Sequence, residues 1–149
     1  MGLDMYLSAE KYHMGALDKE PNSLTRAVEN VIDTKGYQVK SIRIWAGDWR
    51  KANQIHAWFV GNIQGGDDNC GQYYVSIESL RDLVNDCQAV LDDHSKAEEL
   101  LPTQEGFFFG DTGYNEYYFA DLKYTIEMLT PFITDEDWLG WDFYYQSSW

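Results

Sequence analysis

Aromatic and polar side chains of the kinds that bind ligands gather in residues 48–63. If this segment is a helix, Asn53 lies within one turn of both Trp49 and His56, and the three side chains share one edge. Small-molecule sites are usually lined by aromatic rings with a few converging polar groups. The segment therefore predicts a candidate pocket, with Trp49, Arg50, Asn53, His56 and Trp58 as its binding residues.

His56 is the natural general base if the protein is an enzyme, because an unperturbed histidine pKa of about 6.5 allows proton exchange near neutrality. The possible nucleophiles Cys70, Ser76, Ser147 and Ser148 stand in no recognisable triad motif. A core helix whose histidine and asparagine satisfy buried backbone groups explains the same residues. We favour that interpretation, so an enzyme is the less favoured alternative.

Metal and cofactor motifs are lacking in the sequence. The three histidines are dispersed, and the two cysteines are too far apart for the paired spacing of zinc sites. Residues 67–78 match part of a calcium loop, but Gln72 stands where that loop needs glycine. The glycines form neither a Walker nor a dinucleotide fingerprint. We expect no metal and no cofactor.

The chain is strongly acidic, with 25 acidic against 11 basic side chains and a formal charge of −14. Such a field repels nucleic-acid phosphates and anionic membranes and favours a basic partner. We therefore expect no direct nucleic-acid binding and no membrane binding. Acidic clusters at 92–93, 98–99 and 135–137 could imitate spaced phosphates. Solubility alone is the more usual reason for an acidic surface.

Strands and helices are expected to alternate along one domain, residues 1–149, without repeats or linkers. Period-two patterns and short apolar runs predict strands at 3–7, 38–46, 72–75, 107–109 and 141–145. Helical spacing predicts helices at 24–35 after an N-cap offered by Asn22-Ser23, at 48–63, at 76–91, and at 115–130, where Pro131 ends the helix. Residues 65–71 suggest a hairpin-like turn. The predicted fold class is α+β, a single mixed β-sheet of four to five strands with helices packed over it, and a parallel βαβ arrangement is the alternative.

The cysteines and the first residues bear on the compartment. Cys87 falls on the apolar stripe of the helix at 76–91, so it and Cys70 are expected to be free thiols in a reducing compartment. The N-terminus carries Asp4 where a signal peptide carries basic residues, and no apolar stretch is long enough to cross a bilayer. We expect a cytoplasmic protein.

The last twelve residues are rich in aromatic side chains. If they form an edge strand, half of its side chains face solvent, and exposed tryptophan and tyrosine are common interface anchors. Trp141, Tyr144 and Trp149 are therefore candidate binding residues. Packing against the helices that cover the sheet is the simpler explanation of the same pattern.

Four segments resemble an uncharacterised family of small proteins associated with bacteriophage and prophage genomes. They are Met1–Leu7 (MGLDMYL), Trp49–Phe59 (WRKANQIHAWF), Leu100–Gly110 (LLPTQEGFFFG) and Phe143–Trp149 (FYYQSSW). The resemblance spans the chain and implies a phage accessory product that acts inside a bacterium. It implies nothing about catalysis.

Charge, resemblance and the lack of catalytic motifs together predict a phage-encoded acidic accessory protein that acts by binding. The expected partner is a host protein with a basic or aromatic-complementary surface, such as a component of a defence system. The alternative is a small-molecule or nucleotide-binding protein, or an enzyme, with its pocket around the Trp49–His56 helix.

Overall fold

The computed structural model describes residues 2–13 and 23–149. Four strands form one sheet in the order β2-β1-β4-β3. The strands are β1 (Asp4–Tyr12), β2 (Ser41–Arg50), β3 (Tyr73–Val75) and β4 (Asp142–Ser148). The helices are α1 (Ser23–Val31), α2 (Asn53–Asn62), α3 (Ile77–Asp92), α4 (Ala97–Leu100) and α5 (Glu116–Thr134), with short 3₁₀ helices at His94–Lys96 and Glu136–Trp138. The fold is α+β, as the sequence predicts. Of the expected N-cap Asn22-Ser23, Asn22 lies outside the described residues.

All pairings between the four strands are antiparallel, so the prediction of a mixed sheet is wrong. The glycine-rich turn at 65–71 joins α2 to β3 and makes no hairpin. The C-terminal strand is an interior strand between β1 and β3, and not an edge. Its residues Phe143 and Tyr145 are buried on one face, opposite Ala9 and Leu7 of β1. These two rings are buried because they lie on the face of the sheet that the helices cover.

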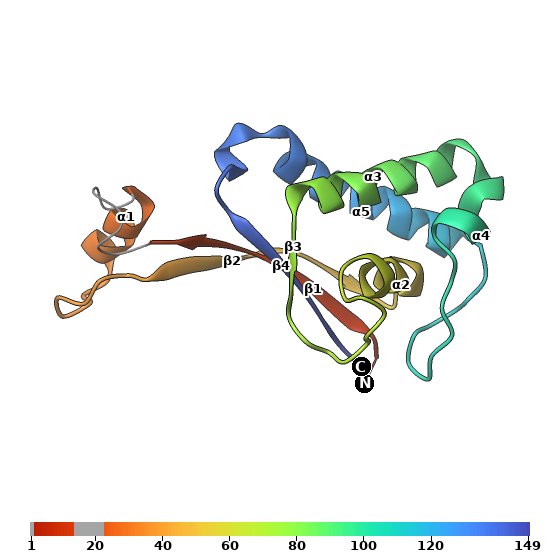
Figure 1. Cartoon of the computed structure of the whole chain (residues 1–149), viewed down its shortest axis with the longest axis horizontal. Helices are drawn as coiled ribbons and strands as arrows, with labels where there is room; N and C mark the ends of the chain where they lie inside the picture. Colours follow the sequence, from red (N-terminus) through yellow and green to blue (C-terminus); the bar gives the residue numbers. More distant parts are fainter. Residues whose placement is uncertain (1, 14–22) are drawn as a thin grey trace.

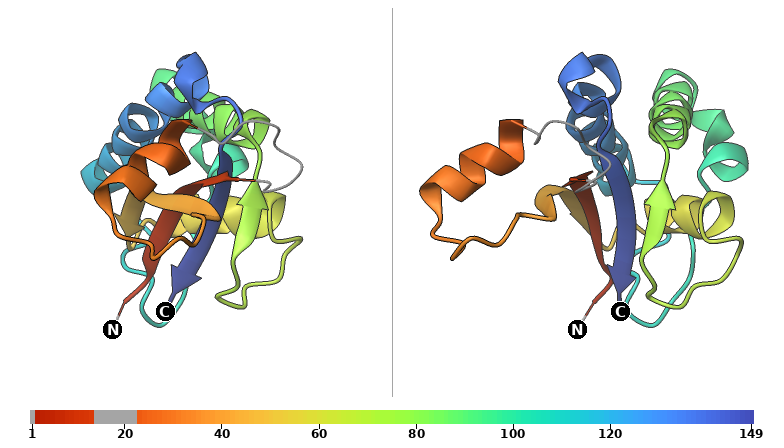
Figure 2. Two further views of the ribbon diagram at one scale, coloured as in Figure 1. Left: turned by 90° about the vertical axis from the view of Figure 1, so that its left-hand side faces the viewer. Right: turned by 60° about the vertical axis from the view of Figure 1, so that its left-hand side comes forward.

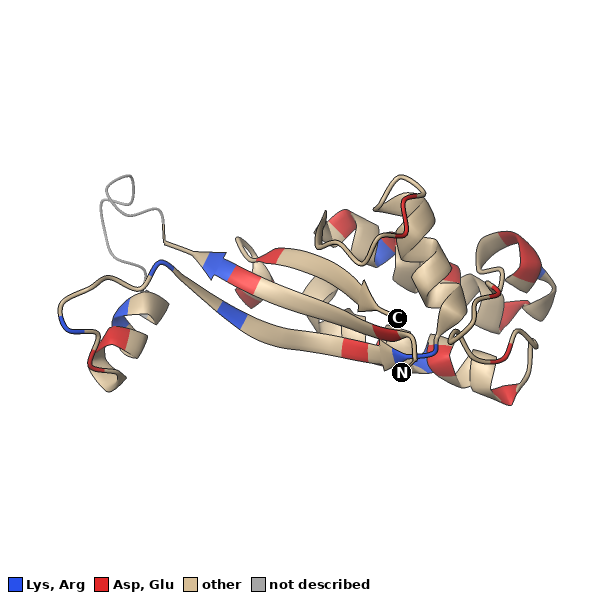
Figure 3. Cartoon of the chain, turned by 90° about the horizontal axis from the view of Figure 1, so that it is seen from below, with Lys and Arg blue, Asp and Glu red and all other residues tan. Residues whose placement is uncertain are grey.

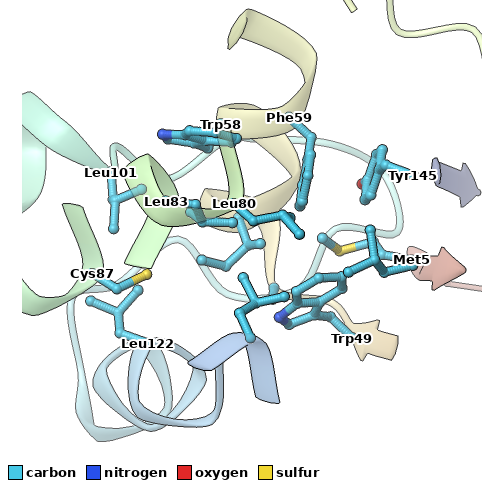
Figure 4. Close-up of a cluster of buried hydrophobic side chains, with 14 of the residues drawn as sticks. Met5, Trp49, Trp58, Phe59, Leu80, Leu83, Cys87, Leu101, Leu122 and Tyr145 are labelled. Atoms are coloured by element: carbon cyan, nitrogen blue, oxygen red, sulfur yellow. The ribbon is translucent and has the colours of Figure 1, made fainter. Parts of the chain in front are cut away.

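The helices α2, α3 and α5 all lie on one side of the sheet, whereas α1 projects on the other side (Figures 1 and 2). Helix α3 begins as predicted, since Ser76 accepts a hydrogen bond from the Ser79 amide at 3.0 Å. Cys87 is fully buried in the expected stripe, and both cysteines are free. Figure 4 shows how the covered sheet face meets these helices, with Met5, Trp49 and Tyr145 of the strands close to Phe59 and Leu80.

Strand β2 runs further than predicted, and the helix predicted from Asp48 starts only at Asn53. The reason is a β-bulge: Leu7 pairs with Gly47 and Ser8 with Trp45, which leaves Ala46 as an extra residue. The bulge turns Trp49 to the covered face of the sheet. Because Trp49 and the buried residues of α2 are then spaced as in a helix, the sequence alone suggests a helix that begins too early. Lys51, with φ of 60°, then breaks the strand.

Two further predictions need correction. Residues 107–109 form a turn and not a buried strand, since Phe107 is 94% exposed and only Phe109 is buried. Helix α5 continues through Pro131 to Thr134. Proline removes one amide donor near the helix end, and the helix continues because Phe132 and Ile133 pack against the core.

Candidate functional site

The predicted pocket around α2 is filled by its own side chains. Asn53 is buried, and its amide group donates to the carbonyl oxygens of Phe109 (3.1 Å) and Asp111 (2.9 Å). Its Oδ1 accepts from the backbone amide of Gln104 at 3.0 Å. All three partners belong to the connection between α4 and α5, so Asn53 fastens that loop to α2.

His56 is fully buried between two hydrogen-bond partners. Its Nδ1 lies 2.8 Å from the Tyr145 hydroxyl and its Nε2 lies 3.0 Å from Asp68 Oδ2. A neutral ring protonated on Nε2 donates to Asp68 and accepts from Tyr145. Burial raises the pKa of Tyr145, so this hydroxyl stays a donor. Phe109 packs edge-on against the imidazole, and His56 therefore holds α2, the 65–71 loop and β4 together.

The two tryptophans of the predicted pocket also have core partners. Trp49 belongs to β2, and its indole donates to the Thr125 hydroxyl of α5 at 2.9 Å. Trp58 donates to Asp86 Oδ2 at 2.9 Å and borders a small groove between α2 and α3 of about 390 Å³. These contacts account for both polar indole groups.

Arg50 lies apart from the buried cluster, at the exposed end of β2, with Nε 3.6 Å from Asp4 Oδ1. It borders a groove of about 290 Å³ that also contains Gln54 and Asp121. Burial raises the pKa of Asp121, and a hydrogen bond from Gln54 only partly offsets this effect. The sequence predicts that all five site residues lie on one helix. In the structure Trp49 and Arg50 belong to β2 and only Asn53, His56 and Trp58 belong to α2, so the five do not line one pocket.

The three C-terminal candidates are also separated. Trp141 is half-buried and packs against Trp138, with ring centroids 5.3 Å apart. Trp149 is 48% exposed and its indole donates to Asp68 Oδ1 at 3.1 Å. Tyr144 lies on the face of the sheet that α2, α3 and α5 leave uncovered. Only Tyr144 of the three therefore belongs to a possible docking surface formed by the strands.

This uncovered surface of the sheet, called the open face below, was not predicted from the sequence. Trp45 of β2 is 64% exposed, and its ring meets Tyr6 of β1 at 5.0 Å between centroids. A groove of about 470 Å³ runs across it. Its lining residues are Tyr6, Leu7, Ser8, Arg43, Ile44, Trp45, Gln72, Tyr144 and Gln146.

The groove of the open face contains one ion pair, and Asp142 of β4 adds a carboxylate near Tyr144. Arg43 lies 2.5 Å from Glu10 Oε2, and its guanidinium is 5.4 Å from the centre of the Tyr144 ring. Burial acts to raise the pKa of Glu10, but hydrogen bonds from Ser41, Arg43 and Tyr12 outweigh it, and the pKa is lowered. Both members of the pair are therefore ionised at neutral pH, and they leave the groove close to neutral.

The negative charge of the molecule lies elsewhere. Residues 52–149 carry 18 acidic and three basic side chains, whereas residues 1–51 carry seven acidic and eight basic ones. Figure 3 shows acidic residues with few basic ones over the helices that cover the sheet, whereas acidic and basic residues are mixed along β1, β2 and the α1 region. We call the surface formed by the acids of α3, α4, α5 and their connecting loops the acidic helical side.

The negative charges of the acidic helical side are almost without neutralising basic partners in the described part of the chain. Among the described residues, no lysine or arginine forms an ion pair with an acid of residues 52–149, and the one ion-pair contact there joins Asp68 to His56.

Neither a group of three or more histidine, cysteine or acidic side chains placed to hold a metal, nor a helix able to span a membrane, occurs within residues 2–13 and 23–149.

No protein-family model matches the chain, and no similar protein is found among curated proteins or solved structures. The site is therefore inferred from its own geometry and charge.

Proposed function

We propose that the protein acts by binding, and that its acidic helical side occupies a basic surface of a host protein, as a phage-encoded accessory protein in a bacterium. One observation carries this proposal: 18 acidic side chains against three basic ones lie in residues 52–149, without lysine or arginine partners in the described part. A surface that only keeps a protein soluble needs no such separation of charge, since dispersed carboxylates serve equally.

Separated charge changes how the molecule meets a partner. The electric field of unpaired carboxylates on one side orients the molecule and raises its rate of association with a basic surface. The same field repels phosphates and anionic membranes. Screening extends over about 8 Å at physiological ionic strength, so the effect weakens as salt is added. A basic surface that normally binds nucleic acid fits this description, and inhibition of such a component of a host defence system is the function we favour.

Two charge-reversal variants test the proposal. Asp82→Lys with Glu127→Lys reverses exposed acids of α3 and α5. Asp33→Lys with Asp48→Lys makes the same change in net charge at exposed residues of the α1 region and β2, outside α3, α4, α5 and their connecting loops. Each protein is used to capture partners from bacterial lysate at low and at high salt. We expect a basic protein whose direct binding, repeated with purified components, weakens at least tenfold in the first variant and stays within twofold in the second.

Equal loss in both variants would show that only total charge matters, and a captured partner without a basic surface would overturn the proposal. Folding of each variant is checked by far-ultraviolet circular dichroism, since all four positions are exposed.

The alternative function, a small-molecule binder or an enzyme built around α2, finds less support. Asn53 and His56 are buried with their polar atoms occupied, and neither borders the grooves described above. A nucleotide and metabolite library tested by thermal shift would revive this alternative if a ligand stabilised the wild-type protein and not a His56→Ala variant.

A further inference from the structure

The α1 region forms an arm, residues 23–40, that projects beyond the end of the sheet on the side of the open face (Figure 2). The arm is tied to itself by a 2.7 Å hydrogen bond from the Val39 amide to Glu29, and its base continues the β1-β2 pair through His13 and Lys40. Isolated helices shorter than about 12–15 residues are marginal in water. The nine residues of α1 therefore gain little stability from the helix alone.

Apolar side chains of the arm point to solvent. Val31 is 86% exposed, Ile32 58% and Tyr37 79%. Large apolar groups also remain exposed on the open face, with Trp45 and Tyr74 the most exposed of them. Large apolar side chains that are exposed in two neighbouring parts of the molecule are typical of an interaction site.

Charge decides what can cover these surfaces. The arm carries three basic and two acidic side chains, and the Arg43 and Glu10 pair leaves the groove of the open face near neutral. A basic partner is drawn instead to the acidic helical side. A second copy of the chain, itself at −14, is repelled least by the part whose charges nearly balance, and residues 1–51, which include β1, β2 and the arm, carry eight basic against seven acidic side chains.

We infer that the open face and the arm form the interface of a twofold-symmetric homodimer, in which the arm of each copy covers the groove of the other. Such an isologous contact closes on itself and covers both apolar surfaces of each chain at once. The acidic helical sides then face outward on opposite ends, where their mutual repulsion is least, and both remain free for a basic partner.

Analytical ultracentrifugation and light scattering of the full chain test the inference. We expect a species of twice the 17.3 kDa chain mass at micromolar concentration. Val31→Asp with Ile32→Asp on the arm, and separately Trp45→Asp on the open face, should each raise the dimer dissociation constant at least tenfold. Phe107→Asp and Leu139→Asp replace exposed apolar residues outside the proposed interface and should change it less than twofold.

Salt separates this inference from the proposed function. Dimer formation should strengthen at higher salt, because repulsion between two acidic chains is screened, whereas binding to a basic partner should weaken. A wild-type protein that remains monomeric at 100 µM would overturn the inference, as would a dimer that survives both interface variants. Open-ended oligomers would exclude the closed twofold arrangement. All variants change exposed side chains, so their circular dichroism should match the wild type, and their Tm should match it at dilutions where the wild type is also monomeric.

Discussion

Replacement of Asn53 by alanine should destabilise the protein severely, although no ligand contacts the residue. Its side chain makes one buried hydrogen bond to Phe109 and two partly buried ones to Asp111 and Gln104. Each lost bond costs about 0.5–1.5 kcal/mol, and more where the partner is left buried and unsatisfied. Three such losses sum to about 3 kcal/mol, which corresponds to a fall in Tm of about 6–12 °C for a chain of this size.

Urea unfolding followed by tryptophan fluorescence measures the change in the free energy of unfolding. Asn62→Ala on the same helix is the matched control, because Asn62 is exposed and its one hydrogen bond goes to the Trp58 carbonyl within the helix. We expect that change to cost less than about 0.5 kcal/mol. Hydrogen exchange at the Gln104 amide should accelerate in Asn53→Ala alone.

Asn53→Asp separates lost hydrogen bonds from lost volume. Aspartate retains an acceptor for the Gln104 amide but places a second carboxylate oxygen against two carbonyl oxygens. Its folded-state pKa should therefore be raised, and the loss of stability should shrink as the pH falls from 7 to 5.5 and the group takes up a proton. If Asn53→Ala costs no more than Asn62→Ala, the role assigned to Asn53 as a loop fastener is wrong.

Three further outcomes follow from the same contacts. His56→Ala should lower the free energy of unfolding by at least about 3 kcal/mol in urea melts, because it leaves Tyr145 and Asp68 without their partner and opens a cavity; a change below 1 kcal/mol would contradict its structural role. The Tm of the wild type should rise between 50 and 500 mM sodium chloride, since salt screens repulsion on the acidic helical side, and a falling Tm would show that attractive pairs dominate. Asp121→Asn should raise the Tm at pH 7. Burial raises the pKa of Asp121, so the ionised carboxylate destabilises the folded state when the pH is above the folded-state pKa. The gain in Tm from asparagine should therefore shrink as the pH falls through the folded-state pKa of Asp121. A Tm difference that is independent of pH would attribute the effect to packing.

Helices and strands whose apolar residues recur with one clear spacing could be predicted from the sequence. Helix α3 combines a Ser76 cap with an apolar stripe that reaches Cys87, and β1 alternates buried Met5 and Leu7 with partly exposed neighbours. Local pattern and tertiary packing agree in both. Around residue 48 they disagree, because the bulge at Ala46 gives a strand the spacing of a helix, and Gly47, which can mark a bulge, equally fits the end of a strand.

The candidate site could be predicted less well, for a physical reason. A strand face that is partly apolar is open or covered depending on which side of the sheet the helices pack. The alternation of side chains around Tyr6 and Trp45 does not show which side that is. Tyr144 was found only because the C-terminus is rich in aromatics. The separation of charge, by contrast, is readable in the sequence as the excess of acids after residue 51, but a net charge for the whole chain conceals it.

The bulge also explains how one strand serves both the core and the open face. Trp45 and Trp49 are four residues apart, so a regular strand would point both to the same side of the sheet. Ala46 adds one residue and reverses the alternation, which sends Trp49 inward to Thr125 and leaves Trp45 outward beside Tyr6. Gly47 then allows close approach of Met128, where any larger residue would collide. The side of the sheet to which the exposed tryptophan points is thus set by the same bulge that turns Trp49 into the core.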